Sequence, residues 1–95
     1  MFVVELQYNV DRAGREPSHR AHAEYLASLT ERGVLRGAGP LVDANGGLLV
    51  YDVPDRAALQ EVLDNEPYVQ AGLVAQTLVR EWNPGKGSWF TTAVS

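Results

Sequence analysis

The sequence contains no cysteine among its 95 residues. Disulfide bonds, thiolate nucleophiles and cysteine-based metal sites are therefore excluded. No apolar stretch is long enough to cross a bilayer, and the first residues lack the basic region and apolar run of a signal peptide. We therefore expect a cytoplasmic protein that neither spans nor binds a membrane.

Basic charge is also scarce. Eight Lys and Arg residues stand against twelve Asp and Glu residues, a formal charge of -4. Proteins that bind the phosphate backbone carry an excess or a cluster of positive charge, and this chain has neither. The composition therefore argues against a nucleic-acid partner.

What the sequence does contain is the pattern of one small α+β domain. Its hydrophobic share of 45% is normal for a globular chain. Alternating or β-rich apolar segments predict strands, and segments with apolar residues three and four apart predict amphipathic helices. The expected strands are 2–8, 34–42, 48–53 and 73–82; the expected helices are 17–32, begun by Pro17, and a second from Asp55 to at most Glu66; the expected loops are 9–15 and 43–47, with a turn or short helix at 67–72.

The order of these elements is βαββαβ. Two right-handed crossovers in one sheet give the ferredoxin-like arrangement, a four-stranded antiparallel sheet with both helices on one face. The last strand carries apolar residues on both faces, so we expect the helix-free face to be covered by a second copy of the chain. We assign residues 1–84 to this domain and 85–95 to a C-terminal tail, whose Trp89 and Phe90 suggest that it covers apolar surface.

His22 is the strongest candidate for chemistry. It shares one helix face with Tyr25, Leu26 and Leu29, so it points at the sheet and needs a hydrogen-bond partner. The topology places Glu66, just past the second helix, at the same end of the domain; Tyr8 and the backbone near Gly39 are other possible partners. A histidine held by a carboxylate is a good general base. The alternative is that His22 is a satisfied core histidine and Glu66 a surface carboxylate.

The sequence contains only weak signs of a metal site or a phosphate-binding loop. A metal site at His19 and His22 is conceivable, because residues three apart on a helix are neighbours, but the acidic residues lie mostly on the far face. Lys86 between two glycines lacks the remaining residues of a phosphate-binding loop. We therefore expect no metal and no cofactor.

Three motifs, in order, resemble the YCII-like family. The stretch 22–29 with Gly33 and 38–40 resembles its His-Leu-x-x-Leu-x-x-Leu helix, Gly and Ala-Gly-Pro strand. Residues 66–72 resemble its Asp-Pro-Tyr/Phe-Val-x-Ala-Gly segment, and 80–84 resemble the end of its last strand. The resemblance runs almost to Pro84.

This resemblance implies a homodimer of the dimeric α/β-barrel kind and an active site built on a His–Asp pair. The histidine falls on His22 and the aspartate on Glu66, a departure that adds one methylene; Asp64 is the second choice. The family's Arg-Pro before the histidine is replaced by His19 and Arg20. One relative is a dehydrochlorinase of a chlorinated hydroxyquinol, and related folds include lactone isomerases.

Together these points lead to a first hypothesis, a cofactor-free lyase or isomerase that acts on a small cyclic molecule, phenolic or lactone-like. His22 is then the acid/base, Glu66 its partner, and a substrate pocket is lined by Tyr8, His19, Gly39, Pro40 and Tyr68. The alternatives are a non-catalytic protein that binds a small molecule through the same fold, and an interaction module that uses Trp89 and Phe90.

Overall fold

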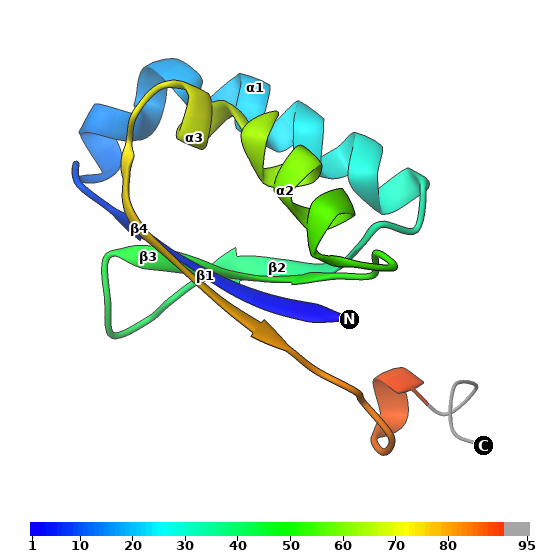
Figure 1. The fold of residues 1–95 in the computed structure, drawn as a ribbon. Coiled ribbons are helices and arrows are strands. Elements are labelled where there is room, and N and C mark those ends of the chain that lie inside the picture. The colour runs from blue at the N-terminus through cyan, green and yellow to red at the C-terminus, as the bar shows by residue number, and fades with distance from the viewer. Residues whose placement is uncertain (91–95) are drawn as a thin grey trace.

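The computed structural model describes residues 1–90, which form one antiparallel sheet covered on one face by helices (Figure 1). The elements, in chain order, are β1 (Phe2–Tyr8), α1 (Arg12–Glu31), β2 (Leu35–Pro40), β3 (Gly46–Tyr51), α2 (Arg56–Asp64), α3 (Pro67–Gln70), β4 (Val74–Glu81) and the 3-10 turn η1 (Ser88–Phe90). The strand order β2-β3-β1-β4 is that of a ferredoxin-like fold, as the sequence predicts.

The first helix begins earlier than expected. The sequence predicts a loop over 9–15 and a helix start at Pro17, whereas α1 starts at Arg12 and contains Pro17 in its second turn. Asp11 caps the helix, because its side chain accepts a hydrogen bond of 2.9 Å from the backbone N–H of Gly14. The prediction was wrong because proline is favoured in the first turn but is not confined to it.

The hairpin between β2 and β3 is also shifted. The expected turn at 43–47 lies at 41–45, and both Gly46 and Gly47 belong to β3. A Cβ atom on Gly46 would lie 2.4 Å from the backbone oxygen of Leu6 in β1. The glycine pair therefore permits close packing of two strands, a requirement that sequence alone does not distinguish from turn formation.

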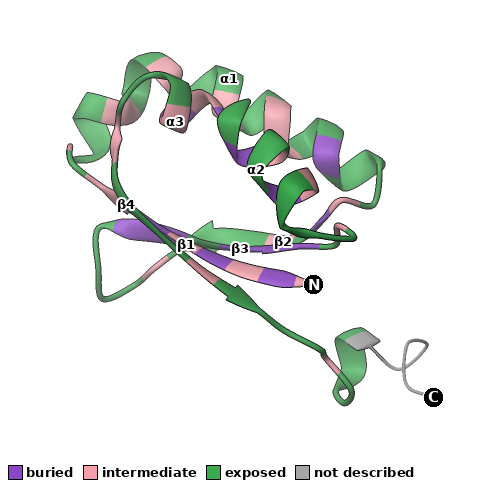
Figure 2. Cartoon of the chain, in the orientation of Figure 1, coloured by how far each residue is buried: buried purple, intermediate pink, exposed green. Residues whose placement is uncertain are grey.

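The core lies between the sheet and the helices. Alternate residues of β1 are buried, and they appear as purple bands along this strand in Figure 2. The buried apolar cluster consists of Phe2, Val4, Leu6, Leu29, Leu35, Leu49, Tyr51, Leu59 and Leu63. This packing fixes α1 above the sheet and so determines where its polar residues can reach.

The opposite face of the sheet carries no helix. Glu5 is paired there with Leu48 of β3 and Leu78 of β4, both about two-fifths exposed. Trp89 of η1 lies on this side, because a Cβ on Gly37 of β2 would be 3.9 Å from its ring. Residues 91–95 of the predicted tail, and the side chain of Phe90, lie outside what the structure describes. Within residues 1–90, no helix is long and apolar enough to cross a membrane.

Candidate active site

His22 and Glu66 are in hydrogen-bond contact beneath α1. The Nδ1 atom of His22 contacts Oε1 of Glu66. The imidazole is 13% exposed and the carboxylate is completely buried. Because an ionised carboxylate only accepts hydrogen bonds, Nδ1 carries the proton in this pair and Nε2 is left as the basic nitrogen.

Glu66 is held in place by a second set of contacts. Its Oε2 atom accepts hydrogen bonds from the backbone N–H groups of Tyr68, at 2.9 Å, and Val69, at 3.2 Å. Glu66 is therefore the N-cap of the four-residue helix α3, which Pro67 begins. A buried carboxylate needs such donors, and three of them here fix its orientation toward His22.

Tyr68 completes the support of the imidazole. Its ring stacks on His22 with the centroids 3.9 Å apart and the planes 7° from parallel. Its hydroxyl is 3.1 Å from Nδ1 of His19, and its ring meets that of Tyr8 edge-on at 5.5 Å. The short helix α3 and its N-cap thus supply both groups that confine His22, namely the carboxylate of Glu66 and the ring of Tyr68.

Burial raises the pKa of the phenols of Tyr8 and Tyr68. The next contribution differs between them: the neighbouring Tyr68 raises the pKa of Tyr8 further, whereas the Arg15 guanidinium opposes the rise at Tyr68. Both phenols therefore remain protonated at neutral pH, and the Tyr8 hydroxyl can donate a hydrogen bond to a ligand, whereas that of Tyr68 is engaged by His19.

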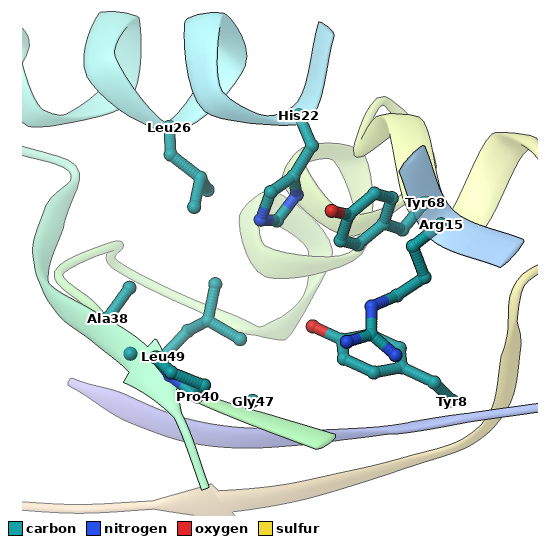
Figure 3. Close-up of a pocket in the computed structure, with 10 residues that line it drawn as sticks. Tyr8, Arg15, His22, Leu26, Ala38, Pro40, Gly47, Leu49 and Tyr68 are labelled. Atoms are coloured by element: carbon teal, nitrogen blue, oxygen red, sulfur yellow. The ribbon is translucent and has the colours of Figure 1, made fainter. Parts of the chain in front are cut away.

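A cavity of about 250 Å³ opens beside this pair, between α1 and the sheet (Figure 3). The imidazole of His22 projects into it from α1. Among residues 1–90, Nε2 of His22 has no hydrogen-bond partner of its own. The lining residues are Tyr8, Arg15, His22, Leu26, Ala38, Gly39, Pro40, Gly47, Leu49 and Tyr68. The volume lies just below the range of about 300–1,000 Å³ for drug-sized ligands, so it suits a compact molecule.

Most of the residues that the sequence predicts for the substrate pocket line this cavity, but not all of them do. Tyr8, Gly39, Pro40 and Tyr68 line it. His19 does not, and instead borders a neighbouring hollow. Asp64, the second choice as partner, is exposed and accepts a hydrogen bond from Gln60 at 2.8 Å, so the structure does not bring it to His22.

Sequence reasoning missed two residues of the cavity that matter for its chemistry. Arg15 was assigned to a loop, yet it lies in α1 two turns before His22 and on the same face. The capping signal of Asp11 with Gly14 three residues later could have revealed it. Gly47 was assigned to a turn, yet a Cβ there would lie 2.9 Å from the Tyr8 hydroxyl, so the missing side chain makes room for that group.

The described part of the chain holds no cluster of metal ligands. Within residues 1–90, no three His, Asp or Glu side chains converge in a way that could hold a metal ion. His19 and His22 each direct Nδ1 at a different partner, Tyr68 and Glu66 respectively.

Comparison with known proteins gives one family and a similar structure. The YCII-related domain matches residues 1–83. The 5-chloro-2-hydroxyhydroquinone dehydrochlorinase of Burkholderia phenoliruptrix AC1100, solved in complex with 2,5-dihydroxybenzoquinone, superposes with a TM-score of 0.73 at 23% identity. The alignment covers 90% of this chain and 96% of that one. No curated protein sequence matches.

Proposed function

Because the chain belongs to the family of YCII-related domains, we propose that it is a lyase or isomerase that acts on a small cyclic molecule, phenolic or lactone-like, by general acid–base catalysis. His22 is the acid/base and Glu66 orients it. The observation that carries the proposal is the Nε2 atom of His22, which faces a cavity and has no partner among residues 1–90, while Nδ1 is held by a buried carboxylate.

The geometry suits proton transfer at Nε2. The neutral imidazole removes a proton from a carbon or hydroxyl of the bound ring, and the resulting imidazolium is stabilised by the carboxylate of Glu66. In a lyase, the electron pair then expels an anion from the neighbouring carbon. In an isomerase, the same imidazolium returns the proton to another atom of the ring. Neither route needs a group beyond the pair and the cavity.

The similar structure supports the substrate class. That dehydrochlorinase acts on a hydroxylated, chlorinated ring and was solved with a quinone bound. The present cavity has apolar walls from Leu26, Pro40 and Leu49 and the hydroxyl of Tyr8 as a donor. Apolar walls with a few polar groups are what a hydroxylated ring requires.

A non-catalytic binding protein is the competing function, and substitution of His22 separates the two. We expect His22→Asn to keep ligand binding within a few-fold and to lower turnover of chlorinated hydroquinones or small lactones by about 10²-fold or more, the range of general acid–base contributions. The measurement is absorbance-detected turnover beside equilibrium binding of the same compound.

A matched pair of carboxylate variants serves as the control. Glu66→Gln should reduce turnover, because it removes the charge that stabilises the imidazolium, whereas Asp64→Asn on the exposed face of α2 should not. If wild type turns over none of these rings, or if His22→Asn turns them over at the wild-type rate, the catalytic proposal is wrong.

We further propose that the protein is a homodimer joined through the helix-free face of the sheet. Leu48 is 40% exposed and Leu78 is 41% exposed on that face, and Trp82, which directly follows β4, is 39% exposed. The register places Leu48 and Leu78 on either side of Glu5, so they form one patch. A contiguous exposed apolar patch is characteristic of an interaction surface.

A further inference from the structure

We propose that Arg15 is the substrate-recognition residue of this cavity and that the ligand carries an anionic oxygen, a carboxylate or an ionised ring hydroxyl. This deepens the proposed function by naming the charge of the substrate, and it rests on that function for the location of the site. It does not require that the site be catalytic.

Arg15 is anchored at one corner of its guanidinium. The Nη1 atom donates to the backbone oxygen of Val10 at 3.1 Å and to Oδ1 of Asn45 at 2.8 Å. The guanidinium carbon lies 4.4 Å from the centre of the Tyr8 ring, and Figure 3 shows the two groups stacked at one end of the cavity. The Arg15 side chain also takes part in a hydrogen bond with the Tyr68 hydroxyl. Since a guanidinium has five N–H donors, these contacts fix its position and still leave donors for a ligand.

The charge of Arg15 has no carboxylate partner within residues 1–90. The ion pairs of the described chain join Arg20 to Glu24, His22 to Glu66 and Arg36 to Asp52. Among the residues that line the cavity, Arg15 is the one whose side chain is positive at every physiological pH. In a protein with an excess of acidic residues, a half-buried arginine that has no carboxylate partner within residues 1–90 and lies beside a cavity indicates an anionic ligand.

The remaining walls define the rest of the ligand. The Tyr8 and Tyr68 rings lie between Arg15 and His22, and the floor is formed by Ala38, Pro40 and Leu49. A flat apolar ring therefore fits against the tyrosines, with its anionic oxygen at Arg15 and the atom that loses a proton at Nε2 of His22. The ligand class is a compact aromatic or unsaturated ring with one anionic oxygen.

The test uses benzoate and benzamide, which have nearly the same shape and differ in charge. Isothermal titration of the full chain should show that wild type binds benzoate at least about tenfold more tightly than benzamide, as a charge-assisted hydrogen bond requires. Arg15→Gln should abolish this preference by weakening benzoate alone, and Arg15→Lys should keep part of it.

The control variant is Arg20→Gln, which removes the same charge from the exposed face of α1 and should leave the preference unchanged. Amide spectra of each variant report whether the fold is kept. Equal affinities for the two probes in wild type, no binding of either, or an unchanged ratio in folded Arg15→Gln would overturn the proposal. If wild type shows the benzoate preference but turns over none of the ring compounds, only the proposed catalytic function is refuted.

Discussion

At the scale of single residues, the buried hydroxyl of Tyr51 is a cost that the fold tolerates. Among residues 1–90 it has no hydrogen-bond partner, although the side chain is fully buried in the core. An unsatisfied buried hydroxyl costs about 1–3 kcal/mol. We therefore expect Tyr51→Phe to raise the free energy of unfolding by about 1 kcal/mol, measured by urea denaturation.

The same variant has a signature in alkaline solution. Burial, and then the charge of Glu66, raises the pKa of Tyr51 above its ordinary value of 10.0. Above that pH the unfolded chain loses a proton that the native chain keeps, so stability falls as pH rises. Tyr51→Phe should make this decline shallower. An equally steep decline in the variant, or a loss of stability at neutral pH, would show that the hydroxyl is satisfied after all.

Two adjacent glycines of β3 should respond differently to replacement by alanine. At Gly47 the new Cβ meets the Tyr8 hydroxyl, the movable end of a side chain that lines the cavity. At Gly46 it meets the backbone oxygen of Leu6, which cannot move without disturbing β1. We expect Gly46→Ala to lower the free energy of unfolding by about 1–3 kcal/mol. Gly47→Ala should instead cost less stability and weaken ligand binding.

The check is a urea melt and a benzoate titration of each variant, with wild type beside them. A large stability loss at Gly47 with unchanged binding would mean that the Tyr8 hydroxyl is not placed by that glycine.

At the scale of elements, the N-terminus of α1 links helix capping to ligand recognition. Asp11 caps the turn that carries Arg15. Asp11→Ala should cost about 1 kcal/mol of stability and also reduce the preference for benzoate over benzamide. Asp55→Ala removes the equivalent cap of α2 and should cost about as much stability without changing the preference. Equal effects of the two variants on binding would contradict the link.

The elements themselves were predictable wherever hydrophobic periodicity was strong. The alternation of 2–8 gave β1 without error, and the apolar stripe of α1 placed His22 on the face toward the sheet. Topology then placed Glu66 at the same end of the domain. What periodicity could not supply is the capping role of Glu66, because glutamate is not among the favoured N-cap residues and a four-residue helix has no period to detect.

The errors lie at glycines and a proline. The sequence places Gly14, Gly46 and Gly47 in loops and uses Pro17 as the start of a helix. In the structure they lie within α1 and β3. A side chain at Gly46 would meet the backbone oxygen of Leu6, and one at Gly47 would meet the hydroxyl of Tyr8. Close contacts with the distant strand β1 explain Gly46 and Gly47, and one sequence does not display such contacts. The residues missed in the cavity, Arg15 and Gly47, lie at or beside these glycines.

At the scale of the whole molecule, the apolar face opposite the helices predicts association. We expect sedimentation equilibrium at micromolar concentration to give the mass of a dimer. Leu78→Glu should give a monomer, because it places a second carboxylate beside Glu5 in the centre of that patch. Val42→Glu changes a fully exposed apolar residue of the β2–β3 turn and should leave the mass unchanged. A monomeric wild type would refute the proposed dimer.

The cavity draws its walls from β1, α1, β2, β3 and α3, so no single element carries it. A ligand that binds there must therefore favour the folded chain over every unfolded form. By mass action, a compound at a hundred times its dissociation constant adds about 2.7 kcal/mol to the folded state, and each kcal/mol shifts the melting midpoint of a domain this size by about 4–8 °C. The melting temperature can therefore be used to find the substrate. Among ring compounds screened in plates, those that bind the cavity would raise the melting temperature of the protein.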